Sequence, residues 1–132
     1  MLIFKLESQT SNEVTRIFKT LQTIIPLDIY KNLFQVILTD NGHEFFDVNN
    51  IECILSTGEY VTHLFFCDPH ASRQKVTIEK NHEFIRYILP KGSSFKDITQ
   101  QNSNLIMNNI NSLCRDSLNG KSPYEAILFL CD

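Results

Sequence analysis

The stretch VILTDNGHEF, residues 36–45, decides how this chain is organised. Its apolar, β-branched run stops at Asp40, and Asn41-Gly42 follows as a typical turn dipeptide. This pattern predicts a short buried strand over residues 35–39 that ends by presenting the Asp40 carboxylate. A polar side chain placed at a strand end in this way is a candidate for chemistry.

A second carboxylate lies 39 positions further along the chain, at Glu79. An apolar run over residues 60–67 predicts another strand, and a polar loop and a helical pattern over residues 72–89 follow it. Glu79 falls on the more polar side of that predicted helix. Carboxylate oxygens are preferred ligands of Mg²⁺ and Mn²⁺, so Asp40 and Glu79 form a candidate divalent-metal site.

The remaining patterns alternate between strand and helix. A strand is expected over residues 1–6, and a helix should start with a capping box at Thr10 and Glu13 and end before Pro26. Strands that alternate with helices indicate an α/β domain with parallel strand pairs. Three strands make a small sheet, which suggests that the sheet is incomplete. Further helical segments are predicted at residues 27–33, at 47–55, around 105–113, and after a cap at Ser122.

Length, hydropathy and charge narrow the possibilities. A chain of 132 residues suits one domain with a real core, and no apolar run approaches the roughly 18 residues of a membrane span. We therefore expect a cytoplasmic protein without membrane contact. The net charge of −3 argues against DNA binding by this chain alone, because phosphate contacts need clustered Lys and Arg. The cysteines are scattered, so reduced thiols are favoured over a zinc site built on Cys67 with His70 or His63.

Three motifs carry a family resemblance. They are TDNGHEF at residues 39–45, FCDPHASRQKVTIEKNHEFIRYILPKGSSF at residues 66–95, and LNGKSPYE at residues 118–125. In this order and at this spacing they resemble bacterial DDE transposases of the insertion-sequence-thirty type, whose core is similar to that of the retroviral integrases. The resemblance extends from about Met1 to Leu130.

The resemblance implies an α/β fold: an RNase H-like integrase core that lacks its first two strands, with a helical C-terminal tail. The partial core is expected over residues 1–95 and the tail over residues 96–132. Members of the family hold two divalent ions, Mg²⁺ or Mn²⁺, with two Asp and one Glu. The matching catalytic and metal-binding positions here are Asp40 and Glu79. No residue matches the first Asp of the family, so we expect an N-terminally truncated copy.

Each candidate residue also has a simpler structural interpretation. Taken singly, an Asp before Asn-Gly is most often a turn residue and a Glu on a helix is most often solvated. The joint family match favours the catalytic interpretation for Asp40 and Glu79. Possible DNA contacts come from a turn amide and from cations near the predicted catalytic helix, where a solvated helix face is the simpler alternative. These residues are Asn41, Lys75, Lys80 and Arg86.

The resemblance therefore predicts a transposase function: DNA integration or transposition by metal-dependent phosphodiester cleavage and strand transfer, here in a truncated and inactive copy. Arg73 and Val76 depart from the family pattern, which has an aromatic residue and a Gly at these positions. The alternative is a non-catalytic fragment that regulates or poisons full-length transposase by mixed oligomerisation. The expected partners are transposon and target DNA, with a homo-oligomer or a mixed oligomer. A stand-alone nuclease would need another carboxylate, for which the first predicted strand offers only Glu7. Marginal stability is also expected, because missing strands leave a sheet edge exposed.

Overall fold

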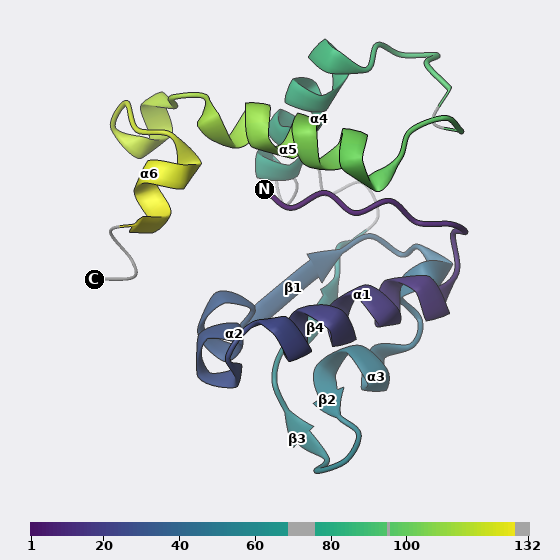
Figure 1. The fold of residues 1–132 in the computed structure, drawn as a ribbon. Coiled ribbons are helices and arrows are strands. Elements are labelled where there is room, and N and C mark those ends of the chain that lie inside the picture. The colour runs from purple at the N-terminus through teal and green to yellow at the C-terminus, as the bar shows by residue number, and fades with distance from the viewer. Residues whose placement is uncertain (69–75, 95, 129–132) are drawn as a thin grey trace. The chain divides into compact units, whose positions relative to one another are not determined.

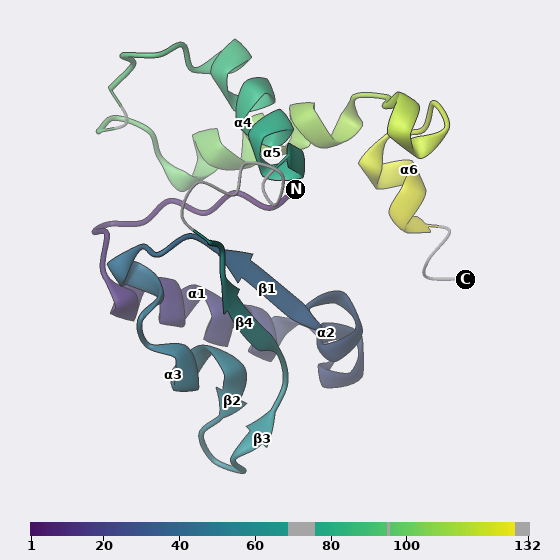
Figure 2. The same ribbon diagram turned by 180° about the vertical axis from the view of Figure 1, so that it is seen from behind.

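The computed structural model of the chain describes residues 1–68, 76–94 and 96–128 (Figure 1 and Figure 2). Backbone contacts divide the chain into two compact units. Met1–Lys5 joins Lys75–Asp132 in one of them, which we call the helical unit, and Leu6–Gln74 forms the other, which we call the sheet unit. None of the helices in the described residues is both long enough and apolar enough to cross a membrane.

The sheet unit contains short helices and two small sheets. Its elements are α1 Ser11–Ile24, α2 Leu27–Leu33, β1 Val36–Thr39, the 3₁₀ turn η1 His43–Phe45, α3 Val48–Glu52, β2 Cys53–Ile54, β3 Glu59–Tyr60 and β4 His63–Phe66. β1 and β4 pair in parallel, with Val36 opposite His63 and Thr39 opposite Phe66. β2 and β3 form a separate antiparallel hairpin within the connection between β1 and β4. The mixed α/β content and the parallel strand pair predicted from the sequence are thus present, and the RNase H-like arrangement stays a prediction.

One face of the β1–β4 pair carries the core of the sheet unit. Val14 of α1, Ile51 of α3 and Leu64 of β4 are buried together, and Phe18 and Ile37 pack against them. The helical spacing of Val14 and Phe18 explains why α1 lies with one apolar face on the sheet. α1 and α3 therefore cover the same face of the strand pair.

The helical unit contains α4 Val76–Ile88, α5 Gln100–Ser112, the 3₁₀ turn η3 Asp116–Leu118 and α6 Pro123–Leu128. Ile110 of α5 is fully buried, and the guanidinium carbon of Arg115 lies 5.0 Å from the centre of the Phe84 ring. Ser122 begins α6 as predicted: its hydroxyl accepts a bond from the Glu125 N–H, and its own N–H donates to the Glu125 carboxylate. This reciprocal pair is the capping box that the sequence indicates at this position.

The predicted strand over residues 1–6 is wrong. These residues are extended, but no described strand pairs with them. Within the helical unit, side chains of α5 bond the backbone of Met1–Lys5 instead, through Gln100 and Asn111. The apolar residues of this segment favour an extended backbone. Which groups bond its N–H and carbonyl groups depends on residues elsewhere in the chain.

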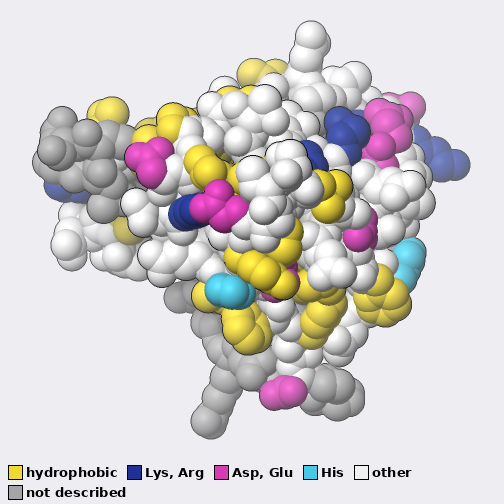
Figure 3. Space-filling view, turned by 90° about the horizontal axis from the view of Figure 1, so that it is seen from below, with side chains coloured by type: hydrophobic (Ala, Val, Ile, Leu, Met, Phe, Trp, Pro, Cys, Tyr) yellow, Lys and Arg dark blue, Asp and Glu magenta, His cyan; other side chains and the backbone are white. Residues whose placement is uncertain are grey.

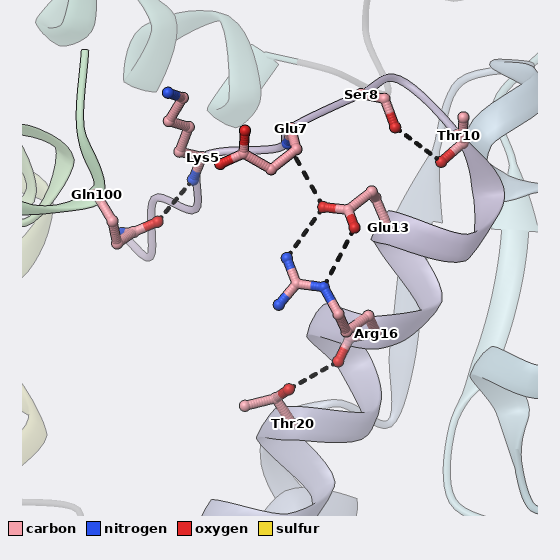
Figure 4. Close-up of polar contacts among 8 residues, drawn as sticks. All are labelled: Lys5, Glu7, Ser8, Thr10, Glu13, Arg16, Thr20 and Gln100. Carbon is pink, nitrogen blue, oxygen red and sulfur yellow. Dashed lines mark hydrogen bonds and ion pairs between the residues drawn. The ribbon is translucent and has the colours of Figure 1, made fainter.

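Two local predictions are also corrected in the sheet unit. Thr10 makes no capping bond to α1; its hydroxyl pairs with that of Ser8, and Glu13 accepts bonds from Arg16 and from the Glu7 N–H (Figure 4). The helix expected over residues 47–55 ends at Glu52, where the β2–β3 hairpin starts. The strand expected over residues 60–67 is accordingly divided between β3 and β4.

Candidate catalytic site at the ends of two parallel strands

Asp40 lies at the carboxyl end of β1, as the sequence predicts. The side chain is exposed, and its Oδ1 accepts a hydrogen bond of 3.2 Å from the Gly42 N–H. A carboxylate that bonds the backbone two residues on forms an Asx turn, which fixes the direction of the chain after the strand. The turn therefore holds Asp40 at the strand end.

The end of β4 lies beside the end of β1. The Cys67 N–H donates to the Thr39 carbonyl at 2.7 Å, and the Asn41 side-chain amide donates to the Cys67 carbonyl at 3.4 Å. Neighbouring strands are about 4.8 Å apart, so this parallel register places Asp68 next to the Asp40–Asn41 turn. Asp68 was not among the candidate residues indicated by the sequence. The carboxyl ends of parallel strands meet at one sheet edge, and that rule would have indicated it.

The turn after Asp40 is held to the segment that precedes α1. Gln9 donates to Glu44 Oε1 at 3.1 Å, and the Gln9 carbonyl accepts from His43 Nε2 at 3.0 Å. The pKa of Glu44 is held below its ordinary value, first by the hydrogen bond from Gln9 and then, to a lesser extent, by a backbone hydrogen bond and the charge of nearby His43. A Cβ atom at Gly42 would lie only 2.6 Å from Glu44 Oε2, so glycine leaves room for this carboxylate. The segment that follows the Asp40 turn is thus bonded to Gln9, which precedes α1.

Glu79 lies on α4, and its side chain is outside the described residues. Asp40 belongs to the sheet unit and Glu79 to the helical unit, so a metal site shared by the two stays a prediction. Among side chains that the structure describes, no three His, Cys, Asp or Glu gather as a metal site. For the zinc alternative, Cys67 is buried and His63 is exposed on β4, whereas His70 is outside the described residues.

The predicted DNA contacts are described only in part. Asn41 is exposed and its amide bonds the Cys67 carbonyl, which supports a turn-shaping role and does not test DNA contact. Arg86 is exposed and lines a shallow hollow of about 400 Å³ with Glu83 and Tyr87. Lys75 lies outside the described residues, and so does the side chain of Lys80.

A larger groove lies in the sheet unit. It measures about 590 Å³ and is lined by side chains of α1 together with Asp47 and Asn50. Its two cations are engaged within the protein: Arg16 pairs with Glu13 (Figure 4), and Lys19 donates to the Cys53 carbonyl. On the face shown in Figure 3, apolar side chains gather while Lys and Arg side chains stand apart from one another. Among the described side chains on this face, the Lys and Arg groups do not form one continuous positive patch of the kind that phosphate binding needs.

Comparison with known proteins shows what this chain is similar to. It is 32% identical over 124 residues to the ORF3 integrase of Spiroplasma virus SpV1-R8A2 B, which covers 94% of this chain and 36% of the viral protein. It is 32% identical over 95 residues to the IS1086 transposase of Cupriavidus metallidurans, covering 72% of this chain and 26% of the transposase. It is 29% identical over 126 residues to transposase InsI of IS30C from Escherichia coli K12, covering 96% of this chain and 30% of InsI.

The chain thus spans about a third of the length of these curated relatives. No family model matches the chain, and no solved structure matches it either. The resemblance predicted from the TDNGHEF motif and its two companions is nevertheless confirmed by relatives that cover most of the chain. Over most of its own length, the chain is a homologue of insertion-sequence transposases, among them that of IS30, and of a viral integrase.

Proposed function

We propose that this chain carries part of the metal-dependent site of a transposase, with Asp40 and Glu79 as the catalytic carboxylates. The observation that supports this most directly is the placement of Asp40 in an Asx turn at the carboxyl end of β1. In α/β sheets, the carboxyl ends of parallel strands are where ligands bind. Because the homologues are named transposases and an integrase, we assign a catalytic role to a carboxylate in this position.

The residues of the proposed site suit Mg²⁺ or Mn²⁺. Carboxylate oxygens are hard ligands, and Asp40 and Glu79 would each supply one. When bound, such an ion supplies Lewis-acid stabilisation of the phosphodiester oxygens and activation of the attacking hydroxyl. Asp40 would orient the ion, and the turn at Asn41-Gly42 would keep that carboxylate at the strand end.

Transposon and target DNA are the proposed substrates, and the proposed activity of the complete site is strand cleavage and transfer. Residues 1–132 contain no counterpart of the first Asp of the family, so we propose that these residues by themselves have no strand-transfer activity. Two-metal chemistry needs a carboxylate that bridges both ions, and two carboxylates would hold at most one ion weakly.

A second candidate function is regulation. A non-catalytic fragment that joins full-length transposase in a mixed oligomer would lower the activity of the assembly. The exposed apolar residues on the uncovered face of the β1–β4 pair favour this function, because such surfaces commonly bind protein. Val36, Leu38 and Phe65 are the residues concerned.

Metal binding and strand transfer test the first proposal separately. Titration with Mn²⁺, followed by its electron paramagnetic resonance signal, should show one weak site in the unmodified chain. Asp40→Asn and Glu79→Gln should each remove it. The controls Asp28→Asn and Glu83→Gln change exposed carboxylates in the sheet unit and on α4, and should leave it intact.

An oligonucleotide strand-transfer assay with the same proteins should show no product. Unchanged Mn²⁺ binding in both site variants would refute the proposed metal site. Efficient strand transfer that disappears in Asp40→Asn would instead refute the proposed inactivity. For the regulatory alternative, adding this chain to an active full-length relative should lower strand transfer in proportion to the amount added.

A further inference from the structure

The turn that carries Asp40 is held on two sides. On the side of β4, Thr39 is buried and its carbonyl accepts a bond of 2.7 Å from the Cys67 N–H, which fixes the end of β1. Asn41 adds a longer bond of 3.4 Å to the Cys67 carbonyl. On the other side, the residues after Asn41 are held by the side chain of Glu44.

The Glu44 carboxylate folds back over Gly42. A Cβ atom at Gly42 would lie 2.6 Å from Glu44 Oε2 and 2.9 Å from its Oε1, so both carboxylate oxygens lie against this glycine. The Gly42 N–H is also the group that donates to Asp40 Oδ1, at 3.2 Å. Gly42 therefore contacts two carboxylates: its N–H bonds that of Asp40, and that of Glu44 occupies the space beside its Cα.

The Glu44 carboxylate is itself fixed by groups outside the turn. Only 15% of the side chain is exposed, its Oε1 accepts from Gln9 Nε2 at 3.1 Å, and its Oε2 lies 3.6 Å from His43 Nδ1. The other ring nitrogen of His43 bonds the Gln9 carbonyl. Phe45, the next residue of η1, packs against the core of the sheet unit. The position of the carboxylate over Gly42 is thus set by the segment before α1 and by the core.

We propose that Glu44, held by Gln9, is a positioning residue for the site proposed above. Its carboxylate keeps Gly42 in the conformation in which the Gly42 N–H bonds Asp40. The consequence for metal binding rests on the proposed function, whereas the contact with Gly42 does not. Groups that orient a metal ligand without touching the metal typically change metal affinity when they are removed.

The proposal depends on residues of the sheet unit alone. It also gives Gly42 and Glu44 a common physical reason, because a side chain at position 42 would displace the carboxylate that holds the turn. A charge-assisted bond such as the one from Gln9 to this carboxylate is stronger than a bond between neutral groups. Removal of either partner should therefore loosen the turn.

Hydrogen exchange at the Gly42 amide tests the positioning role without metal. Glu44→Ala should make this exchange about fivefold faster, whereas Glu44→Gln keeps the shape and an oxygen for Gln9 and should retain the slow rate. Glu59→Ala removes a carboxylate on β3 that pairs with Lys31, and should leave Gly42 unchanged. Equal exchange at Gly42 in Glu44→Ala and Glu59→Ala would overturn the proposal.

Gln9→Ala tests the same contact from its other end. It should also speed exchange at Gly42, while exchange at Leu64, in the buried core, stays as it is because the unit remains folded. This variant leaves the carboxylate in place, so it remains informative if Glu44→Ala fails to fold. Unchanged exchange at Gly42 in Gln9→Ala would overturn the proposal that Gln9 holds Glu44.

Titration with Mn²⁺, followed by electron paramagnetic resonance, tests the consequence for the site. Glu44→Ala should weaken Mn²⁺ binding by about tenfold, whereas Glu44→Gln and Glu59→Ala should bind as the unmodified chain does. Unchanged affinity in Glu44→Ala would overturn the proposal. Equal weakening in Glu44→Gln would also overturn it, because the charge of Glu44 and not its position would then be what matters. If the unmodified chain binds no Mn²⁺, the proposed function fails, and exchange at Gly42 still decides the positioning role.

Discussion

The side-chain amide of Gln100 bonds the backbone around Lys5 as a neighbouring strand would. Its Oε1 accepts from the Lys5 N–H at 2.8 Å (Figure 4), and its Nε2 donates to the Ile3 carbonyl at 3.1 Å. Asn111, three turns further along α5, makes a similar pair of bonds to Met1: it donates to the Met1 carbonyl and accepts from the Met1 ammonium group. Two helix amides thus hold an extended segment that pairs with no strand among the described residues.

We expect Gln100→Ala to loosen this segment. A net hydrogen bond contributes about 1 kcal/mol, so exchange of the Lys5 amide hydrogen should become about fivefold faster in the variant, while α5 itself remains folded. Hydrogen exchange followed residue by residue measures this directly. Gln101→Ala, at the exposed neighbouring position of α5, is the matched control. Equal exchange at Lys5 in the two variants would contradict the role of Gln100.

Gly42→Ala should destabilise the sheet unit by about 1 kcal/mol. The new Cβ would come within 2.6 Å of the Glu44 carboxylate, which must then move and lose its bond from Gln9. Chemical denaturation measures the free energy of unfolding. In a Glu44→Ala background, where the carboxylate is absent, Gly42→Ala should cost less. If the two costs are the same, the close approach is not what requires glycine at position 42.

Lys19 and Lys31 should differ in their effect on stability. Lys19 donates to the Cys53 carbonyl and the Gln22 side chain, and partial burial lowers the pKa of its amine. Lys31 pairs with Glu59 at the surface. Lys19→Ala should lower the free energy of unfolding by about 1.5 kcal/mol, and Lys31→Ala by less than about 0.5 kcal/mol, because exposed ion pairs contribute little. Comparable losses in thermal or chemical unfolding would contradict this ranking.

The α6 capping box should depend on pH. Bonds from the Ser122 N–H and hydroxyl hold the pKa of Glu125 below its ordinary value. A depressed carboxyl pKa stabilises the folded state above the unfolded value, about 4.3 for Glu, and that stabilisation is lost as pH falls through the folded pKa. Carboxyl-detected nuclear magnetic resonance should therefore find Glu125 titrating at lower pH than a solvated Glu.

Ser122→Ala gives a second test of the same cap. It should raise the Glu125 pKa towards its ordinary value and destabilise α6 by about 1 kcal/mol. Ser117→Ala, at an exposed serine of η3, is the control for removal of a hydroxyl. A Glu125 pKa that is unchanged in Ser122→Ala would show that Ser122 is not the cause of the depression.

Short-range sequence information was sufficient for several features. The helical spacing of Val14 and Phe18 predicted α1, and Ser122 with Glu125 predicted the start of α6. The β-branched run before Asp40 predicted β1 and the turn that follows. In each case the decisive interactions join residues within a few positions of one another, so the pattern itself contains them.

Other features depended on residues far apart in the chain. Met1–Lys5 was expected to form a strand, but its partners are amides about a hundred positions away on α5. Local propensity sets the backbone conformation of such a segment, whereas its hydrogen-bond partners depend on which distant groups the folded chain places beside it.

The sequence by itself determined the motifs, most helices and the position of Asp40 at the end of a strand. Tertiary structure alone decided that Asp68 lies beside the Asp40–Asn41 turn, because that proximity follows from the parallel register of β1 and β4. It also decided that the outward N–H of Leu64 on β4 is bonded by the Glu52 carboxylate. Local patterns specify how the side chains of a strand alternate, whereas only the assembled strands show which distant group bonds each backbone N–H.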